Sequence, residues 1–212
     1  MSAARSGGDS IALQRVRTLI RVAERTPKLQ RTQGQIHLLA YWRGPKTLPT
    51  ATLLASSEAL GIFVDASTYG IGFIFNSRWL AWKFVPHPLL PLGPDGKLIM
   101  SWAELVAVEM GMRTLIAAGL RNVMVIVHSD NQGVVVALES GKWTQKYDLD
   151  EIVKRILLFS GKAGLSLKMK WIPTKENPAD NPSRGVYPPA ELAFDCRPSI
   201  PRALSEMIQE VE

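Results

Sequence analysis

Three short apolar runs follow one another between residues 61 and 85, with only a few residues between them. These gaps are too short for a helix, so the runs are expected to form strands linked by tight turns, one of them at Asn76-Ser77. The later segments alternate between helical patterns (101–118, 130–139, 149–161 and 177–184) and strand patterns (123–127 and 165–172). This order predicts an α/β fold with a mixed sheet and helices on its faces.

The 212 residues are expected to divide into a basic N-terminal extension (1–58), the α/β domain (59–186) and a C-terminal tail (187–212). The first 31 residues hold seven basic and two acidic side chains, whereas the remainder holds 18 and 17. The net charge of +6 is therefore concentrated at the N-terminus, where a helix is predicted over residues 10–25. Such an arm attracts polyanions, although a solvated helix face explains it equally well.

Several classes of protein are excluded by what the chain lacks. Cys196 is the single cysteine, which rules out an internal disulfide and favours an intracellular setting, in the nucleus or the cytoplasm. No apolar run approaches the roughly 18 residues of a spanning helix, so no membrane association is expected. The sequence contains no zinc-binding spacing, no Walker loop and no G-x-S-x-G motif, and its three histidines are scattered.

Four acidic residues occupy positions where a purely structural sequence rarely places a charge: Asp65, Glu104, Asp130 and Asp180. Two end apolar strands and two begin helices, so all four converge if these elements meet at one edge of the sheet. Clustered carboxylates repel one another unless cations neutralise them. Their oxygens favour hard ions, which predicts a site for two Mg²⁺ or Mn²⁺ ions, the arrangement used for phosphodiester hydrolysis.

Structural explanations for these acids remain open at this point. Asp65 and Asp130 can cap the turn or helix that follows each of them. Ser101 and Glu104 fit a capping box at the start of the 101–118 helix.

The last acid has a structural explanation too. Asn177 is a suitable N-cap, Pro178 suits the first helical position, and Asp180 in the first turn complements the helix dipole. Pro182 is expected to disfavour helical geometry at Asn181, which affects the direction of the Asp180 side chain.

Four segments, in this order, resemble the ribonuclease H domain of retroelement reverse transcriptases, of the LTR or DIRS-like retrotransposon type. They are VDASTYGIG at 64–72, SWAEL at 101–105, SDNQ at 129–132 and WIPTKENPADNPSR at 171–184. The resemblance implies a ribonuclease H-like fold, a five-stranded mixed sheet with antiparallel strands 1–3, flanked by helices. It also implies two-metal hydrolysis of the RNA strand of RNA–DNA hybrids, with a reverse transcriptase polymerase domain as a partner. The family's acidic motif falls on the four acids named above.

Two features of the cellular enzymes of this family are missing. Residues 173–179 contain no histidine, and residues 141–148 are too few for the basic helix that these enzymes carry there. Hybrid binding is therefore assigned to other side chains. Small polar groups suited to reading 2′-hydroxyls are Ser67, Asn131 and Gln132. Phosphate contacts are assigned to Lys142, Lys146, Lys175 and Arg184.

Four tryptophans lie at apolar positions of predicted strands or helices and are assigned to the core: Trp79, Trp82, Trp102 and Trp171. Two other functions stay open beside the ribonuclease. One is a catalytically silent domain that binds nucleic acid or a protein. The other is a DNA-cutting relative such as an integrase or a junction resolvase.

Overall fold

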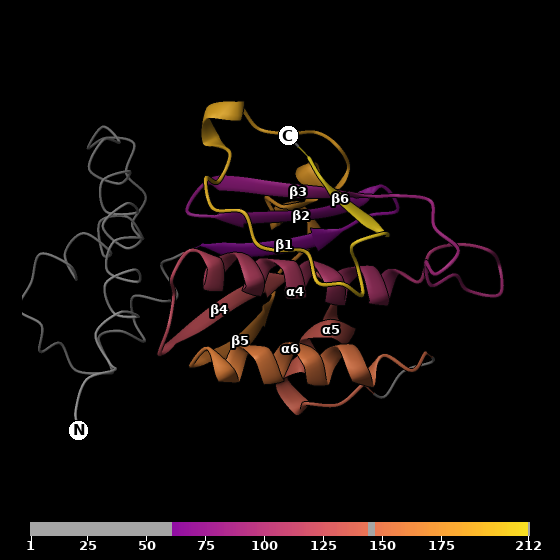
Figure 1. Cartoon of the computed structure of the whole chain (residues 1–212), viewed down its shortest axis with the longest axis horizontal. Coiled ribbons are helices and arrows are strands. Elements are labelled where there is room, and N and C mark those ends of the chain that lie inside the picture. The colour runs from indigo at the N-terminus through magenta and orange to yellow at the C-terminus, as the bar shows by residue number, and fades with distance from the viewer. Residues whose placement is uncertain (1–60, 144–146, 212) are drawn as a thin grey trace, which may run out of the picture.

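A six-stranded mixed sheet forms the centre of the molecule in a computed structural model, which describes residues 61–143 and 147–211 (Figure 1). The strands are β1 (Ile62–Ala66), β2 (Gly70–Phe75), β3 (Arg78–Phe84), β4 (Val123–Ser129), β5 (Leu165–Trp171) and β6 (Ile208–Glu210), in the order β5-β4-β1-β2-β3-β6. The pairs β1–β2, β2–β3 and β3–β6 are antiparallel, and β1–β4 and β4–β5 are parallel. The predicted α/β class is confirmed: the sheet is mixed and flanked by helices, and its first three strands are antiparallel.

The hairpin between β2 and β3 turns where the sequence predicts. Asn76 and Ser77 both have positive φ angles, 51° and 65°. A two-residue turn with positive φ at both positions matches the right-handed twist of the flanking strands. The turn fixes the register in which Phe75 faces Arg78, and with it the buried faces of both strands.

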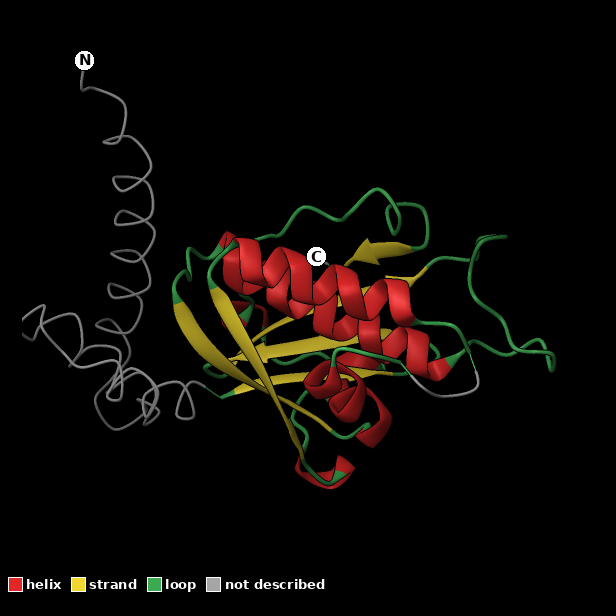
Figure 2. Ribbon diagram, turned by 90° about the horizontal axis from the view of Figure 1, so that it is seen from below, coloured by secondary structure: helices red, strands yellow, loops and turns green. Residues whose placement is uncertain are grey.

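Two long helices cover one face of the sheet, and a short helix lies on the other. The helices are α4 (Met100–Ala117), α5 (Gln132–Ser140), α6 (Asp150–Lys162) and α7 (Asp180–Ser183), with 3₁₀ turns at η2 (Thr174–Glu176) and η3 (Ala190–Leu192). Figure 2 shows α4 and α6 side by side on the same side of the sheet. Their apolar residues join the inward side chains of the strands in one main core. A smaller cluster lies on the α7 face, around Trp79 and Ala179.

The approach of α7 to the sheet requires glycine at position 72. A Cβ atom there would lie 2.4 Å from the carbonyl oxygen of Ala179 and 2.8 Å from the backbone nitrogen of Ser183. Both distances are shorter than van der Waals contact allows, so a larger residue would push α7 away from β2. The glycine therefore lets α7 pack directly against β2, at the position that pairs with Asp65 of β1.

The expectation of five strands is wrong by one, because the segment assigned to a tail supplies β6. The backbone of residues 208–210 pairs with β3, and the side chains of Phe194, Leu204, Met207 and Ile208 are buried in the main core. Pairing satisfies backbone groups of β3 that a free sheet edge would leave open. The limits predicted for the three domains stay a prediction.

The predicted N-terminal helix, the basic extension and Lys146 lie outside the described residues. Within the part of the chain that the structure describes, no helix is both long and apolar enough to cross a lipid bilayer.

Candidate active site

Three carboxyl groups from distant parts of the chain meet at one edge of the sheet. Asp65 lies near the end of β1, Asp130 directly follows β4, and Glu104 lies in the first turns of α4. Because β1 and β4 are parallel neighbours, their carboxyl ends open at the same edge. One oxygen atom from each of the three residues lies within 4.8 Å of the others. The predicted convergence is therefore found for these three acids.

Glu104 reaches this edge because it plays no part in capping its helix. The helix begins one residue earlier than predicted, with Ile99 at the N-cap and no side-chain cap, so the proposed capping box with Ser101 is wrong. The side chain of Glu104 points toward the sheet instead, and the residue is 6% exposed. Its Oε2 atom is buried and has no hydrogen-bond partner. A buried acceptor without a donor is costly, so this oxygen is available to a ligand.

Asp65 is held by two side chains of the segment 171–184. The hydroxyl group of Ser183 donates to its Oδ2 atom at 2.6 Å, and the amide group of Asn177 donates to its Oδ1 atom at 3.2 Å. The same amide also donates to the Val64 carbonyl at 2.9 Å. Asn177 is thus a buried bridge to β1 rather than the cap of the last helix, which begins at Asp180. These two positioning residues were not predicted as site residues.

Asp130 is free of the capping role that the sequence left open for it. The neighbouring Asn131 caps α5 instead, because its Oδ1 atom accepts from the Val134 amide at 3.2 Å. The backbone carbonyl of Asp130 accepts a hydrogen bond from the indole of Trp171 at 3.0 Å. This bond fixes the backbone from which the Asp130 side chain projects.

Asp180 lies beside the group of three and not within it. Its Oδ1 atom accepts from the Arg184 side chain at 2.9 Å, and its negative charge still acts on Asp65 and Glu104. The expected disruption by Pro182 does not occur, since α7 includes Asn181 and Pro182. Proline is tolerated in the first turn of a helix, where its missing N–H has no intrahelical partner.

The electrostatics of the cluster favour a bound cation. Burial raises the pKa of Asp65 to about 7, with the charges of Asp130 and Asp180 adding to the effect against the Ser183 hydrogen bond. Burial likewise raises the pKa of Glu104 to about 9, helped by the charges of Asp65 and Asp130. A divalent cation reverses both effects, because it stabilises the ionised forms. The all-oxygen donor set and the unpartnered Oε2 atom fit a hard ion such as Mg²⁺ or Mn²⁺.

The solved structures that are similar to this chain include two ribonuclease H domains. One is the N-terminal ribonuclease H domain of a Mycobacterium tuberculosis protein, solved as a fusion with maltose-binding protein; it is 15% identical, with 59% of this chain and 91% of that chain covered and a TM-score of 0.38. The other is ribonuclease H1 of the halophilic archaeon Halobacterium salinarum; it is 13% identical, with 59% and 96% covered and a TM-score of 0.35. No protein-family model matches the chain, and no curated protein does.

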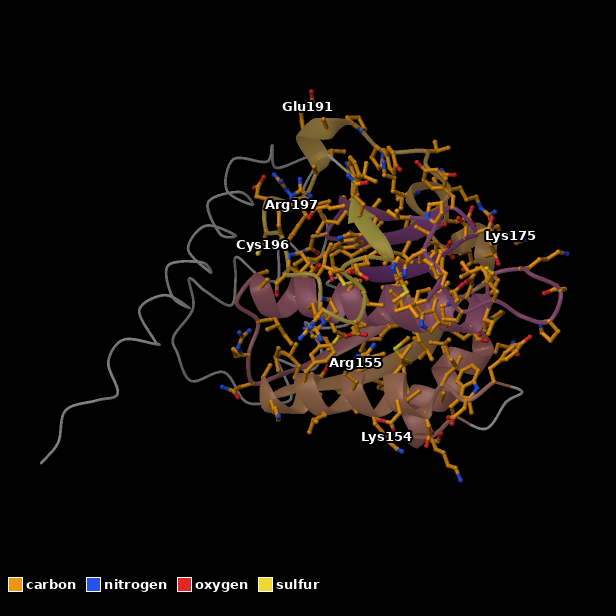
Figure 3. The ribbon with its side chains drawn as sticks, turned by 45° about the vertical axis from the view of Figure 1, so that its right-hand side comes forward. Lys154, Arg155, Lys175, Glu191, Cys196 and Arg197 are labelled. Atoms are coloured by element: carbon orange, nitrogen blue, oxygen red, sulfur yellow. The ribbon has the colours of Figure 1, made fainter. Side chains whose placement is uncertain are left out.

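The residues predicted to contact nucleic acid divide into two groups. Ser67 is buried, and its hydroxyl group is used within the fold: it donates to the Ser183 carbonyl at 2.7 Å and accepts from the Tyr69 amide at 3.0 Å. Asn131 is occupied as the cap of α5. The side chains that remain exposed are Gln132, Lys142, Lys175 and Arg184, and Figure 3 shows Lys175 at the outer side of the molecule.

The assignment of tryptophans to the core is confirmed for Trp79, Trp82 and Trp102 and is wrong for Trp171. Trp171 is 44% exposed, because it is the last residue of β5 and β5 is the edge strand of the sheet. Its position next to Asp130 makes it a residue of the candidate site that sequence reasoning missed. An exposed indole in a strand-end position gives no periodic signal that could have identified it.

Proposed function

We propose that this chain is a metal-dependent ribonuclease that hydrolyses the RNA strand of RNA–DNA hybrids. The observation that carries this proposal is the set of three carboxyl groups within 4.8 Å of one another, one of them with a buried and unpartnered oxygen atom. A purely structural role does not favour such a set, because burial and the neighbouring acids raise the pKa values of Asp65 and Glu104.

Asp65, Glu104 and Asp130 would hold two divalent cations, with Asp180 next to them as the fourth acid of the motif. Such ions, when bound, activate a water molecule and stabilise the leaving oxygen in an in-line phosphodiester displacement. The chain's own contribution is orientation: Ser183 and Asn177 fix both oxygens of Asp65, and Trp171 fixes the backbone of Asp130. Preorganised ligands of this kind lose little entropy when the substrate arrives.

An RNA–DNA hybrid suits the surroundings of this cluster better than a small substrate does. Exposed polar or basic side chains follow the elements of the site, with Gln132 at the start of α5, Lys175 after β5 and Arg184 at the end of α7. Basic side chains position phosphates without reading sequence, so binding is expected to be structure-selective and sensitive to salt. We place the activity in reverse transcription by a retroelement, with a polymerase domain as partner, on the strength of the four resembling segments.

The test is a substrate panel. Labelled hybrid, duplex DNA and duplex RNA are incubated with the full chain in Mg²⁺ or Mn²⁺, beside Asp130→Asn. We expect cleavage of the RNA strand of the hybrid alone, reduced by about 10³-fold or more in the variant, because metal ligation contributes several kcal/mol to the transition state. Asp195→Asn is the matched control. This exposed acid pairs with Arg78 at the start of β3, which is the end of that strand away from the acidic cluster.

Two other outcomes would contradict the proposal. Cleavage of duplex DNA would indicate an integrase-like or resolvase-like nuclease. Tight binding of the hybrid without cleavage in either metal would indicate a catalytically silent binding domain.

A further inference from the structure

A cavity of about 250 Å³ lies on the α7 face of the sheet, near the same edge as the acidic cluster. It is lined by Tyr69, Lys83, Tyr187, Gln209, Glu210 and Val211. Tyr69 immediately precedes β2, and Lys83 pairs across the ladder with Gly70, the first residue of that strand. The start of β2 lies at the edge where β1 ends, since the two strands are antiparallel neighbours. Half of the lining comes from β6 and the residue after it.

A chain of three hydrogen bonds connects one wall of this cavity to the acidic cluster. The Tyr69 amide donates to Oγ of Ser67 at 3.0 Å, and this hydroxyl donates to the Ser183 carbonyl at 2.7 Å. The hydroxyl group of Ser183 in turn donates to Asp65 at 2.6 Å. The wall of the cavity is therefore connected through Ser67 and Ser183 to the Asp65 carboxylate, so a ligand in the cavity has a fixed position relative to the candidate metal site.

The polar groups of the cavity are those that bind an anion. Lys83 forms no ion pair with any residue in 61–143 or 147–211, so its charge is uncompensated there. The carboxylate of Glu210 is neutralised by Arg197, whose Nε atom lies 2.8 Å from it. The hydroxyl group of Tyr187, whose pKa burial and this bond raise to about 12, donates to the hydroxyl group of Tyr69 at 3.4 Å. The cavity thus offers the ammonium group of Lys83 and the O–H of Tyr69, which Tyr187 holds in place.

The aromatic wall of the cavity is held rigidly. The ring of Tyr187 stacks on Trp79 with a centroid distance of 5.1 Å, and the Trp79 indole donates to the Pro189 carbonyl at 3.1 Å. Gly185, with φ at +83°, lets the ring of Tyr69 approach, since a Cβ atom there would lie 3.0 Å from its Cε1 atom. Rigid donors bind a ligand with a smaller loss of entropy than mobile ones do.

We propose that this cavity binds a phosphate group of the nucleic-acid backbone at the same edge of the sheet as the cleavage site, with Lys83 as the cationic contact and the hydroxyl group of Tyr69, held by Tyr187, as the donor. The proposal rests on the proposed function, because the phosphate belongs to the hybrid that the acidic cluster would cleave. An apolar ligand is disfavoured by the ammonium group in the wall, and a cation is disfavoured by the same charge.

The test measures the salt dependence of hybrid binding by fluorescence anisotropy, using full-length chains that carry Asp130→Asn so that the hybrid stays intact. Lys83→Gln is expected to weaken binding about fivefold at low salt and to reduce the slope of log K against log salt by about 1, since one phosphate contact is lost. Lys83→Arg should restore the slope. Lys162→Gln, at the exposed end of α6, is the matched control and should leave the slope unchanged.

Tyr187→Phe is a second, independent probe, because it removes the hydroxyl group and keeps the ring stacked on Trp79. It should weaken binding about twofold to threefold without changing the salt slope, because it removes the neutral hydrogen bond that holds the Tyr69 hydroxyl group. A slope for Lys83→Gln equal to that of Lys162→Gln would overturn the phosphate site while leaving the ribonuclease proposal intact. A chain that fails to bind the hybrid at all would overturn both.

Discussion

Glu104 is the residue whose environment departs most from that of an ordinary surface acid. It lies in the first turns of α4 with 6% of its surface exposed, and one of its oxygens has no donor. Without a cation, burial and the neighbouring charges keep a proton on it up to a pH of about 9, the value of its pKa. The protein therefore carries a local destabilising feature that a bound divalent ion would relieve.

The stability of the metal-free protein should decrease as the pH rises, because two buried acids bind protons more tightly in the folded state. The pKa values of Asp65 and Glu104 are raised in the folded state, to about 7 and about 9, so the folded state binds more protons than the unfolded state above about pH 4. Their contribution to stability is fully present below that pH and is lost as the pH rises through the two folded values. The melting temperature in EDTA should therefore fall between pH 5 and pH 9.

Replacing Glu104 by the neutral, isosteric glutamine should flatten this fall and raise the metal-free melting temperature at pH 8 by about 5 °C. Adding Mn²⁺ should raise the melting temperature of the wild-type chain and leave Glu104→Gln almost unchanged. Glu151→Gln is the control, because its exposed carboxyl group lies on the outer face of α6. A wild-type melting temperature that stays constant or rises between pH 5 and pH 9 would contradict the burial of proton-binding carboxyl groups in the cluster.

At the scale of the elements, α4 and α6 are joined by a buried acid that takes no part in the site. Glu109 on α4 is completely buried, and its carboxylate accepts from Arg113 at 2.9 Å and from Arg155 of α6 at 2.6 Å. Figure 3 shows Arg155 in the space between the two helices. Arg113 is also placed over the ring of Phe159, 4.4 Å from its centroid. The contacts of Glu109 with Arg155 and of Arg113 with Phe159 fix the relative position of α4 and α6, which cover the same face of the sheet.

Glu109→Gln should lower the free energy of unfolding by about 2–3 kcal/mol, because it leaves two arginines without their buried counter-charge. The measurement is urea unfolding followed by circular dichroism. Glu151→Gln, at an exposed position of α6, should change the free energy of unfolding by less than about 0.5 kcal/mol. An equal effect of the two substitutions would show that the buried ion pairs contribute nothing to the packing of α4 on α6.

The elements differ in how well the sequence could predict them. The strands and long helices were predictable because their patterns are local, as at the Asn76-Ser77 turn. Asp65 and Asp130 stood out because charge at the end of an apolar strand is rare. The residues that hold Asp65 could not be predicted, since Asn177 and Ser183 lie 112 and 118 positions away and their polar side chains fit local capping equally well.

At the scale of the whole molecule, the C-terminal segment completes the sheet. The strand β6 has three residues, too few to show an alternating pattern, so it was not predictable from the sequence. Its pairing with β3 extends the sheet beyond the expected five strands and supplies half of the lining of the proposed phosphate cavity. This strand forms because it pairs with β3, and not because its own sequence favours a strand.

Calorimetric titration of Mn²⁺ into the full chain at pH 8 would show whether the acidic cluster binds divalent cations. About two ions should bind to each chain, as expected of a two-metal hydrolase. Binding should be lost in Asp65→Asn and in Glu104→Gln and retained in Asp195→Asn, whose acid lies at the opposite end of β3. Equal heats for all four chains, or no binding to the wild-type chain, would contradict the claim that these carboxyl groups form a metal site.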